Sequence, residues 1–144
     1  MLQEKSFGAV VFLKQGAQTR YLLLNYTGRY WGFVKGGMEQ QESEKETVIR
    51  ELKEETGITD AHFIDGFREV IDYSYCRKGI TFHKVVILYL MEAQSELIKL
   101  SCEHKGYVWL GYEDAINKLL FENGKDVLEE AHTFLINKGI LKKQ

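Results

Sequence analysis

Proline is absent from this 144-residue sequence, and cysteine occurs only twice. Without proline, the turns depend on the 13 glycines and on Asn and Asp, which adopt tight turns readily. Cys76 and Cys102 form no CxxC pair. The sequence therefore argues against a disulfide framework and against a cysteine-rich zinc site, and we expect both thiols to be reduced.

Long apolar runs and an excess of basic residues are also missing. No stretch approaches the ~20 apolar residues that a membrane helix needs, and residues 1–8 contain no hydrophobic signal-peptide region. A net charge of −2 argues against general nucleic-acid binding, because such binding depends on a basic surface. We therefore expect a cytoplasmic protein with no membrane partner, for which a small phosphorylated ligand stays open.

The residues that are present indicate a folded protein of mixed secondary structure. Hydrophobic residues make up 44% and charged residues 28%, a balance typical of a globular domain, which we expect to span residues 1–144. The pattern of strands and helices predicts an α/β or α+β fold, in which helices flank a sheet. Strands are predicted at residues 7–13, 20–25, 31–34, 64–75, 82–91 and 107–110, and helices at 43–56, 114–120 and 126–137.

The predicted helix at residues 43–56 has the clearest boundaries. Ser43 and Glu46 stand at capping-box spacing, and Gly57 is placed to end the helix. At ~100° per residue, one side of the helix gathers apolar residues and is expected to pack on the core. These residues are Val48, Ile49 and Leu52.

Three glutamates of this helix, Glu51, Glu54 and Glu55, fall within one turn and are expected to point away from the core. Residues three and four apart are neighbours on a helix, so the three carboxylates repel one another. Hard oxygen ligands suit Mg²⁺, which would acidify a bound water whose proton another carboxylate could take. Charge spacing alone favours a simpler interpretation, a solvated acidic face, and both interpretations stay open at this point.

A longer motif favours the metal site. Residues 36–58 read GGMEQQESEKETVIRELKEETGI, which matches the Nudix box, G-x5-E-x7-R-E-U-x-E-E-x-G-U with U aliphatic, at every defined position. Nine restricted positions at this spacing are far more specific than a short glycine motif. The sequence thus resembles the Nudix hydrolase family. The resemblance implies a Nudix-type α/β/α sandwich with a mixed β-sheet and the hydrolysis of a phosphoanhydride bond.

The resemblance also implies roles for residues of the box. Glu51, Glu54 and Glu55 would bind Mg²⁺, or Mn²⁺ as the alternative ion, and one of them would be the catalytic base. Arg50 would orient a glutamate through a charge-assisted hydrogen bond. The residues expected to act in catalysis are therefore Glu54, Glu51 and Arg50, and the residues expected to shape the motif are Gly36, Glu42 and Gly57.

Segments outside the box resemble one branch of the family, the hydrolases that cleave diadenosine tetraphosphate asymmetrically into ATP and AMP. The likeness covers nearly the full length and implies a small-molecule nucleotide as the partner. The segments that carry it are GAVVF (8–12), YLLLNY (21–26), WGFVKGG (31–37), DGFREVIDY (65–73), HKVVILYL (83–90), SCEHKGYVWLGYEDA (101–115) and VLEEAHTFL (127–135).

The same likeness indicates substrate-binding residues. Tyr73 and Phe121 match an aromatic pair that sandwiches adenine, where stacking contributes about 1–3 kcal/mol per base. Packing in the core is the alternative role for these aromatic residues, and for Phe121 in particular. Lys35 and Lys84 match lysines that hold the polyphosphate as point charges, where a solvated surface position is the alternative.

Three further positions complete the expected site. Glu103 matches an additional metal-binding glutamate, and His104 is its neighbour near the phosphates, although an isolated histidine is more often structural. Tyr30 stands where the family often has a histidine, and we include it among the expected substrate contacts. Residues 33–42 read FVKGGMEQQE, whereas the family usually reads FPKGHVEPGE, so we expect a less rigid loop.

Two other functions stay open. A hydrolase that removes pyrophosphate from the 5′ end of RNA, or one acting on another nucleoside polyphosphate, would share the helix, but RNA needs a basic track for which the sequence shows no cluster. A non-catalytic nucleotide sensor could keep the fold after losing its metal-binding residues. In this sequence Arg50 and the three glutamates are all present, which favours an enzyme. The sequence carries no signal for an oligomeric state.

Overall fold

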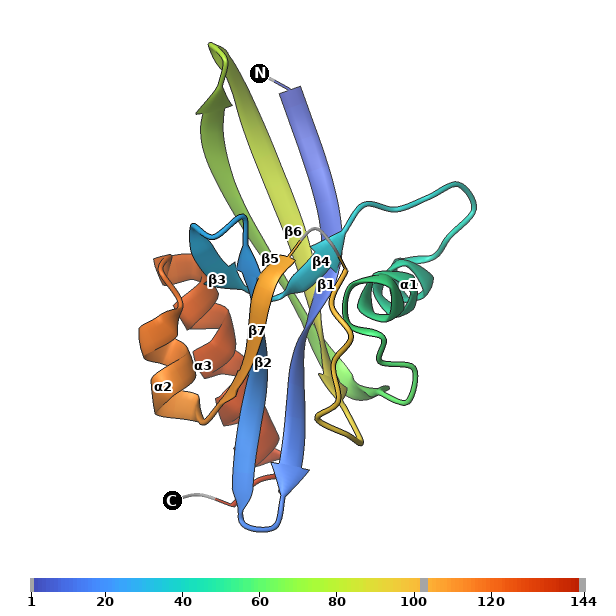
Figure 1. Ribbon diagram of the computed structural model, residues 1–144, viewed down its shortest axis with the longest axis vertical. Coiled ribbons are helices and arrows are strands. Elements are labelled where there is room, and N and C mark those ends of the chain that lie inside the picture. Colours follow the sequence, from blue (N-terminus) through green and yellow to red (C-terminus); the bar gives the residue numbers. More distant parts are fainter. Residues whose placement is uncertain (1, 102–103, 143–144) are drawn as a thin grey trace.

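The computed structural model describes residues 2–101 and 104–142. Figure 1 shows a twisted sheet between α1 on one side and α2 with α3 on the other, which confirms the predicted α/β/α sandwich. None of the described helices is long and apolar enough to cross a membrane. The elements are β1 (Leu2–Gln15), β2 (Gln18–Tyr26), β3 (Tyr30–Gly32), β4 (Val34–Gly36), α1 (Glu44–Thr56), β5 (His62–Arg77), β6 (Ile80–Glu92), β7 (His104–Leu110), α2 (Tyr112–Lys118) and α3 (Glu122–Asn137).

The seven-stranded sheet is mixed. Its main order is β3-β2-β1-β6-β5, with β4 paired to β1 and β7 paired to β2. β1 and β6 are parallel, and the other pairings are antiparallel. On its other edge β1 pairs first with β4, at residues 7–9, and then with β2, at residues 12–15. The chain that leads into α1 therefore leaves from the middle of the sheet.

Alternation along β1 separates two apolar clusters. Successive side chains of a strand point to opposite faces, so residues 7, 9, 11 and 13 pack on the α1 side. Val10 and Phe12 pack on the other side, against Leu128 and Leu135 of α3. Burial of each large apolar side chain contributes about 1.5–3 kcal/mol. Each helical layer is therefore held to the sheet by its own cluster.

The predicted caps of α1 are confirmed. The Ser43 hydroxyl accepts from the Glu46 backbone N–H at 3.1 Å, and the Glu46 carboxylate accepts from the Ser43 backbone N–H at 2.8 Å. Gly57 adopts φ 76°, a left-handed conformation that favours glycine, and ends the helix. These local contacts determine where the helix begins and where it ends.

The predicted core face of α1 is partly wrong. Val48 and Leu52 are buried as expected, but Ile49 is 51% exposed and Glu55 is only 5% exposed. Val48, Leu52 and Glu55 follow the i, i+4, i+7 spacing of one helix face, whereas Ile49 lies about 100° away from Val48. The carboxylate of Glu55 therefore shares the face that packs on the sheet.

The predicted strands are longer or divided in the structure. The hairpin of β5 and β6 extends beyond the helices, together with the first residues of β1 (Figure 1). The predicted strand at residues 31–34 is divided, because β3 pairs with β2 and β4 pairs with β1. Phe121, which directly follows the predicted helix at residues 114–120, is the residue just before α3.

Candidate active site

Arg50 is the centre of the hydrogen-bond network at the start of α1. Its Nε donates to Glu42 at 2.7 Å, and its Nη2 donates to the Gly37 carbonyl at 2.7 Å. Its Nη1 donates to Glu51 at 2.8 Å and to Glu54 at 3.2 Å. One guanidinium therefore links the glycine loop to two of the three expected metal ligands. The fixed geometry of its five N–H donors suits this arrangement.

Glu42 fixes the loop before the helix from the other direction. It accepts from the Glu39 backbone N–H at 2.8 Å and from the Thr47 hydroxyl at 3.0 Å, in addition to Arg50. These bonds, the one from Arg50 first, lower the pKa of Glu42 to about 2. Glu42 is therefore ionised at neutral pH and braces the loop.

Gly36 and Glu51 are in direct contact at the end of β4. A Cβ atom added to Gly36 would overlap the carboxyl group of Glu51. Only glycine leaves this space, and the Glu51 side chain is accordingly 13% exposed. The glycine of the motif thus gives the carboxylate its position.

The three carboxylates of α1 differ in exposure. The side chain of Glu54 is 55% exposed, that of Glu51 is 13% exposed, and Glu55 is 5% exposed overall. Within residues 2–101 and 104–142, no three acidic, histidine or cysteine side chains lie together as a ready metal-binding group. The three expected ligands are therefore not gathered into one group here, although Arg50 Nη1 holds Glu51 and Glu54 close to each other.

The chemistry of these donors nevertheless fits a divalent ion. Carboxylate oxygens are the hard ligands that Mg²⁺ prefers, and the space left by Gly36 brings one of them to the end of β4. Glu54 is exposed enough to turn toward an ion without unfolding the helix. Glu51, Glu54 and Glu55 are the residues of this chain that would hold such an ion.

A cavity of about 690 Å³ lies on the α2 and α3 side of the sheet. It contains Tyr30, Lys35, Tyr73, Lys84 and Phe121, five of the residues expected to bind substrate. They come from β3, β4, β5, β6 and the residue before α3. The other lining residues are Trp31, Gly32, Phe33, Ile71, Ser74, Tyr75, Val86, Leu88, Leu119, Glu122, Asn123 and Gly124.

The aromatic rings of Phe121 and Tyr73 in the cavity are partly exposed. Phe121 is 54% exposed and meets Tyr30 edge-on, with ring centroids 5.6 Å apart. Tyr73 is 36% exposed and lies 6.2 Å from Tyr75. Such exposure is unusual for core aromatics, which removes core packing as the role of Phe121. Flat apolar faces are therefore available in the cavity.

The cationic part of the cavity is close to α1. Burial first, and then the like charge of Lys84, lower the pKa of Lys35 to about 8. Glu55 acts on Lys35 in the opposite direction, as a nearby negative charge. Lys35 therefore lines the aromatic cavity and also experiences the charge of one carboxylate of the helix.

Two expected site residues are not placed. Glu103 lies outside the described residues, and only the backbone of His104 is described, as the first residue of β7. Their expected roles stay predictions. Sequence reasoning missed Tyr26, whose ring lies 4.1 Å from the Lys35 Nζ. A tyrosine at the end of an apolar strand carried no signal for that contact, since it depends on how β2 and β4 are arranged.

The NUDIX domain profile matches residues 3–131, and the chain belongs to the Nudix hydrolase family. It is similar to the asymmetrical bis(5′-nucleosyl)-tetraphosphatase of Mus musculus, with 38% identity over 110 residues, 74% of this chain and 72% of the mouse protein. It is 30% identical over 100 residues to the RNA pyrophosphohydrolase of a Nitratiruptor species, covering 63% of this chain and 64% of that protein.

The solved structures agree with this placement. A binary complex of the Ap4A hydrolase of C. elegans aligns with a TM-score of 0.81 and 29% identity, covering 92% of this chain and 98% of the other. The chain is therefore a Nudix hydrolase with homology to the asymmetrical tetraphosphatases. Enzymes of this family generally use a divalent metal ion, typically Mg²⁺.

Proposed function

We propose that this Nudix hydrolase cleaves dinucleoside polyphosphates with Mg²⁺, converting diadenosine tetraphosphate to ATP and AMP. The observation that carries the proposal is that one cavity gathers aromatic residues and two lysines, one of which, Lys35, also experiences the negative charge of Glu55 on α1. A dinucleoside polyphosphate has the same order of parts, a base followed by phosphates. The similarity to the mouse tetraphosphatase supports the same substrate class.

The cavity is suited to one nucleobase. Phe121, Tyr30 and Tyr73 present flat faces, and every base has a π-face that can stack on them. A volume of about 690 Å³ falls in the usual range for small-ligand sites. We assign to Tyr73 and Phe121 the role of holding the adenine, with Tyr30 beside Phe121 as a further contact.

The phosphates are assigned to the two lysines. Lys35 and Lys84 line the cavity, and an anion beside an ammonium group favours its charged form, since opposite charges attract. Such an anion would stabilise the charged form of Lys35 in particular, because burial lowers the pKa of this lysine to about 8. A polyphosphate would therefore bind along the path from the cavity to α1.

The reaction transfers a nucleotidyl group to water. A new bond forms between the water oxygen and phosphorus, the bridging P–O bond breaks, and the terminal phosphate oxygen of the leaving nucleotide takes the electron pair. A bound Mg²⁺ would neutralise negative charge on the phosphoryl oxygens and would lower the pKa of a water molecule. One glutamate of α1 accepts the proton of that water, and Arg50 orients Glu51 and Glu54 for these tasks.

Hydrolysis of the 5′ end of RNA is the competing assignment, and the similarity to the bacterial RNA pyrophosphohydrolase favours testing it. Both reactions use the same helix and differ in what lies beyond the phosphates. The protein is incubated with diadenosine tetraphosphate and with triphosphorylated RNA in ¹⁸O-labelled water, with and without Mg²⁺. We expect ATP and AMP from the first substrate, only with the metal. Efficient turnover of RNA alone would reverse the assignment.

The variant E54Q separates catalysis from nucleotide sensing. It keeps the size and hydrogen-bonding capacity of the side chain but removes its charge, so a metal ligand is lost while the helix is retained. We expect turnover to disappear while thermal unfolding is unchanged. A wild-type protein that binds the nucleotide without any turnover would instead be a sensor. The cytoplasmic location and the single domain over residues 1–144 stay predictions.

A further inference from the structure

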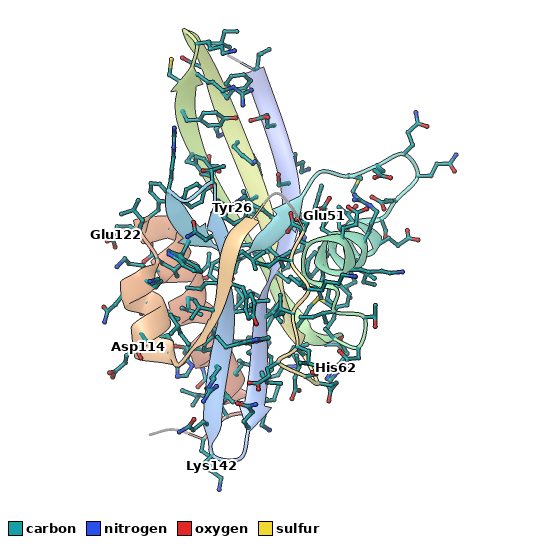
Figure 2. The ribbon with its side chains drawn as sticks, in the orientation of Figure 1. Tyr26, Glu51, His62, Asp114, Glu122 and Lys142 are labelled. Carbon is teal, nitrogen blue, oxygen red and sulfur yellow. The ribbon has the colours of Figure 1, made fainter. Side chains whose placement is uncertain are left out.

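Tyr26 contacts both ends of the segment that carries Lys35. Its hydroxyl donates to the Phe33 carbonyl at 2.5 Å, at the point where β3 gives way to β4. Its ring lies 4.1 Å from the Lys35 Nζ, within the range of a cation–π contact. Figure 2 shows Tyr26 at the end of β2 and Glu51 on α1, at a similar height in this view. One side chain of β2 therefore holds both the backbone and the ammonium of this segment.

The Tyr26 ring is itself held in place. It stacks on Tyr30, with centroids 5.3 Å apart and planes inclined by 12°. The Lys35 ammonium lies 5.7 Å from the Tyr30 centroid and so is close to both rings. Burial, with negative charge from Glu55, raises the pKa of Tyr26 far above its ordinary value, so the hydroxyl keeps its proton as a donor.

Lys35 is subject to a competing attraction. Glu55, one of the expected metal ligands, acts on the ammonium as an opposite charge, while Lys84 repels it. A lysine side chain is a flexible four-carbon stem with no fixed direction of its own. Without the ring, the ammonium would lose this contact and would be free to move toward Glu55.

We propose that Tyr26 is a positioning residue that holds the Lys35 ammonium at the wall of the cavity, where it meets the polyphosphate. The inference rests on the proposed function, because it assumes that Lys35 binds phosphate. Tyr26 touches no substrate in this role and acts only through Lys35. Removal of its ring should therefore weaken phosphate binding in the ground state and the transition state alike, which raises KM and leaves kcat nearly unchanged.

The experiment compares Y26F, Y26L and Y26M with the wild type in the hydrolysis of diadenosine tetraphosphate. Y26F keeps the ring and loses the hydroxyl, so we expect KM within about twofold of wild type. Y26L and Y26M lose the ring, and we expect KM to rise about 3- to 30-fold, the range of a cation–π contact. Two variants without the ring are included because one of them can fail to fold. Y107L, which alters an exposed tyrosine on β7, is the matched control.

A double-mutant cycle with K35M gives the decisive comparison. If Tyr26 acts through Lys35, Y26L adds nothing to the KM of K35M. An equal rise in KM in both backgrounds, or an unchanged KM in Y26L and Y26M, would overturn the proposal and leave Tyr26 as a packing residue. Calorimetric binding of inorganic tripolyphosphate by the same variants needs no turnover. A wild type inactive on every dinucleotide therefore refutes the proposed function, while the tripolyphosphate cycle still decides the role of Tyr26.

Discussion

Gly36 touches the carboxylate of Glu51 so closely that the position of any added Cβ atom is already filled by the glutamate. Gly36 ends β4, and Glu51 lies on α1, which the chain reaches only after the loop of residues 37–43. The contact therefore joins the end of β4 to the helix that carries the expected metal ligands. It makes the glycine of the motif a determinant of where one carboxylate stands.

The substitution G36A tests this contact. The added methyl group must displace Glu51, so we expect kcat to fall at least about tenfold, since ligand positions matter on the ångström scale. Circular dichroism should show an intact fold. G37A is the matched control, because a Cβ atom at Gly37 meets nothing within 4 Å, and it should retain nearly full activity. Equal kinetics for the two alanine variants would contradict the role of the contact.

The substitution R50K tests the hydrogen-bond network. Lysine keeps the charge but cannot reproduce five directed donors, so the loop and the two glutamates are no longer held by one group. We expect a 10- to 100-fold loss of kcat or of apparent metal affinity, measured by titration of activity with Mg²⁺, as roughly expected for partners of metal ligands.

Its control is R68K, which alters another arginine that donates two hydrogen bonds to a glutamate of α1, namely Glu44. Arg68 lies outside the cavity, so activity should stay close to wild type. If R50K were as active as R68K, the proposed role of Arg50 in orienting Glu51 and Glu54 would be contradicted.

The substitution E42Q tests the pH dependence of stability. Hydrogen bonds, that from Arg50 first, lower the pKa of Glu42 from 4.5 to about 2. The folded state therefore prefers the ionised form, and its stabilising effect is complete above about pH 4.5 and disappears as the pH falls toward 2. Urea unfolding should show E42Q to be less stable than wild type at pH 7.

That difference in the free energy of unfolding should shrink steadily between pH 4.5 and 2, the interval between the two pKa values. The opposite trend, a difference that grows on acidification, would contradict the assigned direction of the shift. E39Q is a suitable comparison, since Glu39 is an exposed neighbour whose backbone donates to Glu42.

The substitution F121A tests base stacking. Loss of one stacking face costs about 1–3 kcal/mol, so KM for diadenosine tetraphosphate should rise about 5- to 150-fold. Because Phe121 is 54% exposed, thermal stability should change little. L120A is the control, since Leu120 is 62% exposed and does not line the cavity. A large loss of stability with unchanged KM would show instead that Phe121 is needed for packing.

Much of the fold could be predicted because its causes are local. The capping box of Ser43 and Glu46 and the left-handed Gly57 bound α1 through contacts within a few residues. The hairpins followed from alternating apolar runs separated by polar turns. The Nudix box was readable for the same reason, since most of its members lie on one helix and the loop before it.

The division of one predicted strand into β3 and β4 could not be predicted in this way. Residues 31–34 contain no polar side chain, and nothing in that run indicates that its two halves pair with different strands. Strand pairing is a contact between distant segments, so a single run does not show where its partner changes.

The sequence by itself determined the approximate place of most strands and helices, the caps of α1 and the identity of the acidic residues, because these depend on near neighbours in the chain. Only the tertiary structure decided that Ile49 is exposed and Glu55 buried, that Gly36 meets Glu51, and that Tyr26 lies against Lys35. Those contacts depend on how α1 crosses the sheet and how β2 and β4 share the edge of β1, which is set by the packing of the whole core.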